Sequence, residues 1–374
     1  KFQWRPMALF SRTILIENLA ADRVTVARQP ASDPAPADTA PSEPFEPPPI
    51  SVELQRLAFK EIVIAEAVAG TPARLSLDGN ARYVSGAAEA KIAVDRLDGP
   101  GSLKLSGGYR LADSHFDIDL MVDDPAGGLA TNLLGLPDGV QAVLTGAGDL
   151  SAWKGRLDGK TGASKLAALA ITLNRSGNAI QTTVQGDLHP AVLIPADLRE
   201  TIGDTLAIDL AAGLTETGAV VVERFTAKAA PAAIAVQGRF EPDTGTVNAT
   251  VRTEAIDVSK ITPFAPGLEL KNPAMTAEVT GTVEKPQISA TVTANRAAMN
   301  AVAASDIWLK VQTSPDLAAA QLGAPWTARL ELKEITLDDP QLTKLSRRRW
   351  VIDASGRYDA DATRLPIKAQ ITGA

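Results

Sequence analysis

Histidine and cysteine set the first limit on the chemistry open to this 374-residue chain, which has two of the former and none of the latter. A Ser-His-Asp triad would need His115 or His189 as its base. His115 opens an alternating apolar segment and His189 directly precedes Pro190, and neither lies near a nucleophile-elbow sequence. Without cysteine there is no thiolate zinc site, and two histidines cannot supply a histidine-rich metal centre. We interpret both histidines as surface or turn residues.

Adjacent carboxylates are the other candidates for acid–base chemistry. Asp123 and Asp124 directly precede a proline, as do Asp338 and Asp339, and this context is typical of a turn. The sequence contains no Asp-x-Asp-x-Asp-Gly calcium loop, and its short glycine pairs are not followed by a helix that could bind phosphate. The sequence therefore predicts a protein that is not an enzyme and needs no metal or cofactor.

The charge balance argues against nucleic acid as a partner. The chain has 37 basic and 44 acidic side chains, a net charge of -7, whereas nucleic-acid affinity depends on Lys and Arg neutralising phosphates. The one basic run is Arg347, Arg348 and Arg349. We interpret it as the solvated start of the strand that follows rather than as a site for lipid headgroups.

Alternation of apolar and polar residues is the dominant pattern after Ile50, and it predicts strands with one apolar and one wet face. The clearest case is Phe116, Ile118, Leu120 and Val122. Apolar residues at the same spacing, together with those four, form the set of candidate lining residues: Leu75, Leu77, Ile92, Val94, Leu103, Leu105, Leu144, Val184, Leu206, Ile208, Leu210, Ile234, Val236, Val247, Val251, Val279, Ile288, Val292, Ile307, Leu309, Leu330, Leu332, Ile352, Ile367 and Ile371. The chain is expected to be all-β, with many short strands.

Glycines recur at the apolar phase of these strands, where they predict bends or close backbone approaches. They are Gly79, Gly107, Gly146, Gly186, Gly238, Gly281 and Gly356. Their spacing is irregular, which favours hairpin units with unequal loops over a solenoid of fixed period.

Four regions are expected along the chain. Residues 1–29 form N-terminal strands, and residues 30–49 are a Pro-rich acidic loop or linker that cannot form a core. A first β section covers residues 50–190, with a short helix near 125–136. A second covers residues 191–374, with a short helix near 191–202.

The apolar faces of these strands must either pack against each other or face a ligand, because the predicted helices are too few to cover them. Aromatic residues make up only 4% of the chain although 45% is hydrophobic. An interdigitated core would combine side chains of unlike shape. A lining of small aliphatic side chains is instead expected to face a ligand that slides along it without a fixed stopping point.

Several short stretches in residues 1–160 resemble segments of a known family. They are 4–9 (WRPMAL), 14–19 (ILIENL), 24–28 (VTVAR), 96–101 (RLDGPG), 124–129 (DPAGGL), 133–137 (LLGLP) and 148–155 (GDLSAWKG). These stretches resemble the TamB family of bacterial envelope proteins, part of the wider AsmA-like group. Beyond residue 160 the resemblance rests on the pattern of strands and glycines.

The resemblance implies an elongated, curved, antiparallel-rich sheet folded into an open U-shaped trough with an apolar interior. It implies a periplasmic protein of a Gram-negative bacterium, anchored in the inner membrane, that binds phospholipid acyl chains and carries them toward the outer membrane. Its partner would be a TamA-like outer-membrane barrel. The family's anchor helix and its C-terminal domain, which engages the barrel, are expected to lie outside this chain.

Two further functions compete with lipid transport. An assembly factor for outer-membrane β-barrel proteins and autotransporters, acting with a TamA-like barrel, would hold extended client strands by β-augmentation. An adhesin-like β-solenoid is disfavoured because the chain has no strict repeat.

Overall fold

The structure is a computed structural model that describes residues 1–28, 50–134, 136, 138–190, 199, 203–257, 267–300, 302–317, 323–337, 349–359 and 367–373. It is all-β, as predicted: its strands belong to one open, mixed but mostly antiparallel sheet of 24 strands. The chain divides into two compact units, Lys1–Asn174 (unit 1) and Arg175–Ala374 (unit 2). The Pro-rich stretch 30–49 and the helix expected near 191–202 lie outside the described residues, apart from Arg199.

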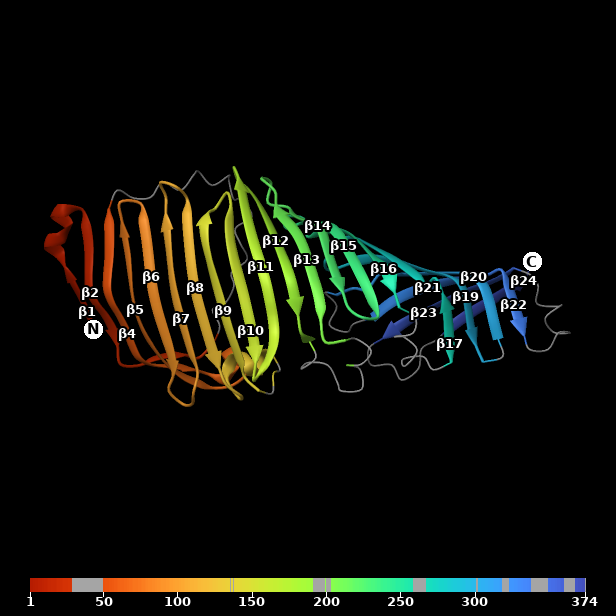
Figure 1. Ribbon diagram of the computed structural model, residues 1–374, viewed down its shortest axis with the longest axis horizontal. Coiled ribbons are helices and arrows are strands. Elements are labelled where there is room, and N and C mark those ends of the chain that lie inside the picture. The colour runs from red at the N-terminus through yellow and green to blue at the C-terminus, as the bar shows by residue number, and fades with distance from the viewer. Residues whose placement is uncertain are drawn as a thin grey trace. The chain divides into compact units, whose positions relative to one another are not determined.

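Unit 1 is a succession of neighbouring strands that runs from β1 to β11 (Figure 1). They are β1 (Phe2–Arg5), β2 (Thr13–Ala21), β3 (Val24–Val26), β4 (Ser51–Ile64), β5 (Ala73–Val84), β6 (Ala87–Arg96), β7 (Ser102–Arg110), β8 (His115–Asp124), β9 (Val140–Asp149), β10 (Trp153–Thr161) and β11 (Ser164–Ser176), which ends just past the unit boundary. β2 and β3 both pair with β4 in parallel, and every other pair in unit 1 is antiparallel. The long chain segment between β3 and β4 makes this parallel pairing possible, because parallel neighbours need a crossover.

Unit 2 continues in the same manner with antiparallel neighbours. Its strands are β12 (Ala179–Leu188), β13 (Leu206–Leu214), β14 (Val220–Lys228), β15 (Ala232–Glu241), β16 (Thr246–Ile256), β17 (Leu268–Lys271), β18 (Ala274–Thr282), β19 (Pro286–Met299), β20 (Val302–Thr313), β21 (Gly323–Leu332), β22 (Glu334–Leu337), β23 (Trp350–Asp359) and β24 (Ile367–Gly373). The long strand β19 pairs along one side with both β17 and β18, and the long strand β20 pairs along one side with both β21 and β22. The interruptions between β17 and β18 and between β21 and β22 therefore lie opposite unbroken strands.

Tight turns link many of the strands and hold them in register. Val84 pairs with Ala87 across the two-residue loop Ser85–Gly86, where both residues have positive φ, 51° and 79°. This is the geometry of a type I′ hairpin turn, in which glycine carries no steric cost and the turn twist matches the strands. Register set in this way fixes which side chains share a face.

The helices among the described residues are short. The α-helices are α1 (Glu66–Ala69) and α2 (Leu129–Leu134), and η1 (Pro6–Ser11) is a 3-10 helix. α2 lies inside the predicted segment 125–136, which confirms that prediction. The structure also has η1 and α1, which lie between strands and are too short to leave a periodic apolar pattern in the sequence.

Candidate functional site

One face of unit 1 is apolar from β1 to β11. Directly paired residues in neighbouring strands point to the same side of a sheet, so the register defines rows of side chains across the strands. One such row is Leu57, Gly79, Ile92, Leu105, Leu120, Leu144, Leu157 and Leu169, on β4 to β11 in order. Every candidate lining residue and candidate glycine of unit 1 lies on this face.

Unit 2 also has an apolar face, on which directly paired residues of neighbouring strands form rows. A row that crosses it from β12 to β24 is Val184, Leu210, Phe225, Val236, Val251, Ala277, Ala290, Val311, Ala328, Ala354 and Ala369. The candidate lining residues and glycines of unit 2 share this face. Alternation read locally thus predicts a long-range arrangement, because neighbouring strands are held in register.

The apolar faces are only partly covered by protein. In β8 the half-buried side chains alternate with exposed ones: Phe116, Ile118, Leu120 and Val122 are half-buried, whereas Asp117, Asp119, Met121 and Asp123 are exposed. Buried apolar side chains among the described residues are few and mostly small: Ala73, Leu136, Val140, Trp153, Ala167, Ala219, Ala233 and Ala294. A closed core would bury its large aliphatic side chains instead.

A hollow of about 580 Å³ lies on the apolar face of unit 1. It is lined from β2, β4, β5, β6, β7 and β8 by Ile16, Val52, Leu54, Ala81, Arg82, Tyr83, Ala88, Glu89, Ala90, Leu105, Gly107, Gly108, Tyr109, Phe116 and Ile118. Only Arg82 and Glu89 are charged, and they pair with each other at 2.8 Å. The hollow crosses six adjacent strands, about 24 Å at a strand spacing of about 4.8 Å.

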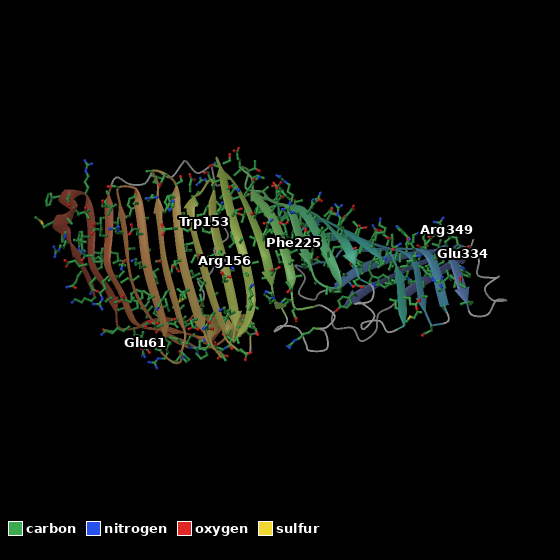
Figure 2. The ribbon with its side chains drawn as sticks, in the orientation of Figure 1. Glu61, Trp153, Arg156, Phe225, Glu334 and Arg349 are labelled. Carbon is green, nitrogen blue, oxygen red and sulfur yellow. The ribbon has the colours of Figure 1, made fainter. Side chains whose placement is uncertain are left out.

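Aromatic side chains border this hollow, and this corrects the expectation of a smooth aliphatic lining. Trp153 lies at the start of β10 (Figure 2). It is 6% exposed, and its ring centroid lies 6.0 Å from that of Phe116. Its indole N–H donates to the carbonyl oxygen of Phe116 at 3.0 Å. Tyr83 and Tyr109 line the hollow together with Phe116, which a count of rings over the whole chain cannot show.

Two glycines provide the space for this indole. A Cβ at Gly146 would lie 2.1 Å from Cζ2 of Trp153, and a Cβ at Gly155 would lie 2.3 Å from Cη2. The two glycines face each other directly across β9 and β10. At these positions the absent side chain makes room for a ring, a role that the repeated strand–glycine pattern does not reveal.

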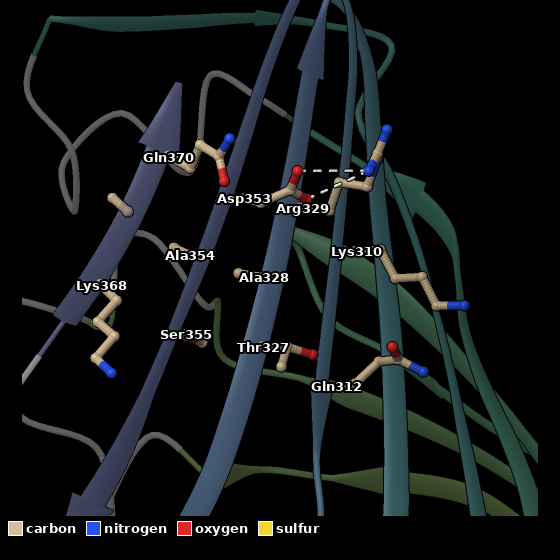
Figure 3. A pocket seen from close by; sticks show the side chains of 11 residues that line it. Lys310, Gln312, Thr327, Ala328, Arg329, Asp353, Ala354, Ser355, Lys368 and Gln370 are labelled. Atoms are coloured by element: carbon tan, nitrogen blue, oxygen red, sulfur yellow. Dashed lines mark hydrogen bonds and ion pairs between the residues drawn. The ribbon is translucent and has the colours of Figure 1, made fainter. Parts of the chain in front are cut away.

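The opposite face carries charge. Arg156 pairs with Asp158 at 2.5 Å in β10, and both side chains are exposed. In unit 2 a polar hollow of about 580 Å³ lies over β20, β21, β23 and β24 (Figure 3). Within it Nη1 of Arg329 lies 3.3 Å from Oδ1 of Asp353. Because these charged side chains are exposed, this face is interpreted as the solvated side of the sheet. Exposed ion pairs of this kind contribute little to stability.

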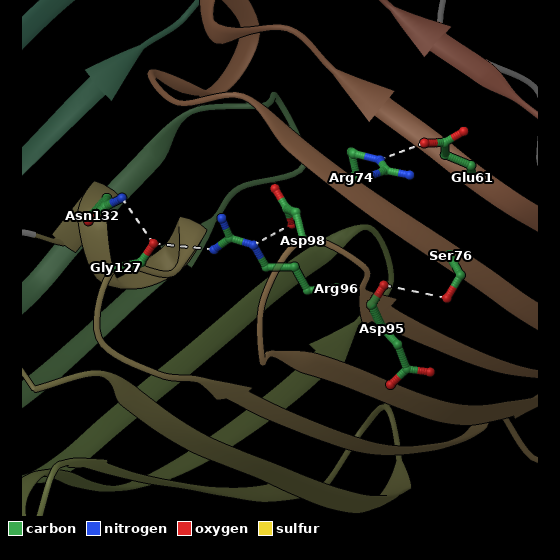
Figure 4. A network of polar contacts seen from close by, with 8 residues as sticks. All are labelled: Glu61, Arg74, Ser76, Asp95, Arg96, Asp98, Gly127 and Asn132. Atoms are coloured by element: carbon green, nitrogen blue, oxygen red, sulfur yellow. Dashed lines mark hydrogen bonds and ion pairs between the residues drawn. The ribbon is translucent and has the colours of Figure 1, made fainter.

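A carboxylate between two arginines joins strands at one end of unit 1. Glu61 of β4 accepts hydrogen bonds from Nε of Arg23 and from Nε of Arg74, each at 2.6 Å (Figure 4 shows the second). The hydrogen bond from Arg23 and that from Arg74 hold the pKa of Glu61 at about 2, below its usual 4.5. Nearby, Arg96 pairs with Asp98 at 2.8 Å and donates to the carbonyl oxygen of Gly127.

α2 is held to the end of β8 by a buried polar contact. Asp124 is 8% exposed and Thr131 is fully buried. The carboxylate of Asp124 accepts from the backbone N–H of Thr131 at 2.8 Å and from its hydroxyl at 3.1 Å. Asp124 thus fixes the helix that follows its turn, and its pairing is structural.

The remaining candidates for chemistry are dispersed. His115 is the first residue of β8 and pairs with Asp149 in the sheet, while His189 follows β12 with its Nε2 buried and without a partner. Within the described ranges no three His, Asp or Glu side chains cluster to hold a metal ion. Arg349 precedes β23 and pairs with Glu331, whereas Arg347, Arg348, Asp338 and Asp339 lie outside the described residues.

Sequence reasoning missed part of the lining. Ile16, Val52, Leu54, Tyr83 and Tyr109 border the hollow but were not among the candidates. The signal was available for Tyr83 and Tyr109, which continue the alternation of β5 and β7. It was obscured in β4, where register shifts follow Leu54 and Phe59 and break the strict period of two.

The fold and this face define the class: an open β-sheet protein whose two units each present a long apolar face. Comparison of the chain with protein families, curated proteins and solved structures finds no match. Within the described part of the chain, no helix is long and apolar enough to cross a membrane.

Proposed function

We propose that the apolar faces bind phospholipid acyl chains and carry them along the sheet. Two observations carry the proposal. Large aliphatic side chains on the apolar face are only half-buried, as in β8, and a hollow of about 580 Å³ lies on that face in unit 1. Apolar surface of this extent that protein covers only in part is typical of an interaction site.

The dimensions and energetics fit this ligand. The hollow crosses about 24 Å of sheet, whereas the hydrocarbon of one bilayer leaflet is about 15 Å deep, so one extended acyl chain can lie across it. Transferring a CH₂ group from water to an apolar surface is worth about 0.8 kcal/mol. A lipid with about 30 such groups therefore faces a barrier on the order of 20 kcal/mol in water, which a continuous apolar face removes.

The resemblance of residues 1–160 to the TamB family supports the same proposal from sequence alone. The open U-shaped trough, the periplasmic location, the inner-membrane anchor and a TamA-like partner accompany it as parts of that proposal. No residue is assigned a catalytic role, and the protein acts through the shape and apolarity of its faces.

Photo-crosslinking from the two sides of a strand tests the proposal. A benzophenone side chain at Leu105 or Leu120 should form adducts with phospholipid, because both positions lie on the apolar face. The matched controls are Ser106 and Asp119, the next residues of the same strands on the other face. Equal labelling from both faces, or no lipid adduct at Leu105 and Leu120, would refute the proposal.

A charge placed on the apolar face tests transport. Leu120→Arg in unit 1 and Val236→Arg in unit 2 should slow the transfer of a fluorescent phospholipid between vesicles at least about tenfold, because a lipid chain must pass an unpaired charge. Met121→Arg, on the exposed face of β8, is the control and should transfer lipid at the wild-type rate. Crosslinks to unfolded outer-membrane polypeptides in place of lipid would instead favour the alternative function, an assembly factor.

A further inference from the structure

Large apolar side chains gather on the surface at the β1 end of unit 1. Phe2 is 59% exposed, Trp4 42%, Met7 73%, Leu9 47% and Phe10 86%. Scattered single exposures are common on protein surfaces, but five within nine residues form a patch. We call these five residues the N-terminal apolar patch.

The local structure holds the patch in a defined shape. Met7, Leu9 and Phe10 project from η1, which ends at Arg12 in the left-handed conformation (φ 56°) with its N–H bonded to the carbonyl oxygens of Ala8 and Leu9. The carbonyl oxygen of Arg12 accepts from the N–H of Ser51 at 2.9 Å, which ties the end of η1 to β4. The turn therefore presents its apolar side chains outward from a fixed base.

The patch is continuous with the apolar face of unit 1. In β1, Phe2 pairs with Leu19 and Trp4 pairs with Ile16, and Ile16 itself borders the hollow. Phe2 and Trp4 therefore lie on the same side of the sheet as the hollow. Among the described strands β1 pairs only with β2, so this end of the face opens at the patch.

The segment that carries the patch is basic although the whole chain carries -7. Residues 1–16 contain three basic side chains, Lys1, Arg5 and Arg12, and no acidic one. The first carboxylate, Glu17, is paired with Arg5 at 2.5 Å. Aromatic and aliphatic side chains flanked by Lys and Arg are the composition of surfaces that insert into the interface of an anionic membrane.

We propose that the N-terminal apolar patch docks unit 1 on an anionic lipid bilayer. Met7, Leu9 and Phe10 enter the interface, while Arg12 and Lys1 contact lipid phosphates. The inference goes beyond acyl-chain binding by the face and stands without it. If the patch docks on a bilayer and the apolar face binds acyl chains, Trp4 and Phe2 connect the bilayer to Ile16 at the border of the hollow.

Sedimentation with vesicles tests the docking. The full chain should bind vesicles of phosphatidylglycerol mixed with phosphatidylcholine, bind pure phosphatidylcholine vesicles more weakly, and lose affinity as salt is raised. The double variant Met7→Glu/Phe10→Glu should lower the partition coefficient at least about tenfold. Leu111→Glu and Met121→Glu, at exposed apolar positions elsewhere in unit 1, should bind like wild type, and circular dichroism should show all variants folded.

Three results would overturn the inference. One is equal binding of wild type and the Met7/Phe10 variant to the mixed vesicles. Another is loss of binding in Leu120→Arg but not in the Met7/Phe10 variant, which would assign membrane contact to the apolar face. The third is a Met7/Phe10 variant that changes only self-association in sedimentation velocity, which would make the patch an interface between copies of the chain.

Discussion

Alanine at Gly155 would place its Cβ 2.3 Å from Cη2 and 2.7 Å from Cζ3 of Trp153, far inside van der Waals contact. The indole cannot swing away freely, because its N–H is bonded to the carbonyl oxygen of Phe116 and only 6% of the residue is exposed. Overpacking of a close-fitted site costs about 1–3 kcal/mol. Gly155→Ala should therefore destabilise the β9–β10 region by about that amount.

Removal of the ring should abolish this cost. Trp153→Ala by itself should cost about 3–5 kcal/mol, as for other large-to-small changes at buried aromatic residues. In the Trp153→Ala background the methyl group at position 155 meets no ring, so the added cost of Gly155→Ala should fall close to zero. The coupling energy of the double-mutant cycle is then about 1–3 kcal/mol.

The same strand offers a matched control. Gly159 lies on the same face of β10, but a Cβ there would stand 3.6 Å from Cβ of Ala167, an ordinary contact. Gly159→Ala should be neutral or slightly stabilising, because alanine restricts the unfolded chain more than glycine. Hydrogen exchange of peptides from β9 and β10 reads the local opening free energy without requiring the two units to unfold together.

Two results would refute this account of Trp153. Equal costs for Gly155→Ala and Gly159→Ala would show that glycine is needed for the strand backbone and not for the ring. A cost of Gly155→Ala that persists in the Trp153→Ala background would locate the clash elsewhere, for instance at the carbonyl oxygen of Thr145, 3.2 Å from the added Cβ.

Two further predictions concern polar contacts of unit 1. The lowered pKa of Glu61 adds stability that is present above pH 4.5 and is lost as the pH falls toward about 2. Urea unfolding should therefore show a larger free energy of unfolding for wild type than for Glu61→Gln at pH 6, and a smaller gap between the two at pH 3. A gap that does not change with pH would contradict the pairing of Glu61 with Arg23 and Arg74. Thr131→Val removes the hydroxyl that bonds buried Asp124 and should cost about 1–3 kcal/mol. Faster hydrogen exchange of α2 alone would verify it, and unchanged exchange would exclude that anchoring role.

Strands and faces were open to prediction because their signal is local. Successive side chains of a strand point to opposite sides, so the alternation at Phe116, Ile118, Leu120 and Val122 marks a strand and its apolar face without knowledge of its neighbours. The same holds for the residues facing the apolar side in unit 2. Where bulges interrupt the period, as in β4, the pattern failed and lining residues such as Leu54 were missed.

Contacts between distant segments required the tertiary structure. The parallel pairing of β2 with β4 follows from the return of the chain after a long connection, and no local preference encodes it. Glu61 meets Arg23 from 38 residues away, and the composition gave no sign that Trp153 lies over Gly146 and Gly155. Sequence determined which side of each strand is apolar, since that depends on a period of two. Only the tertiary structure decided how far those faces are covered and that Trp153 lies against Phe116, since both depend on register across strands far apart in the chain.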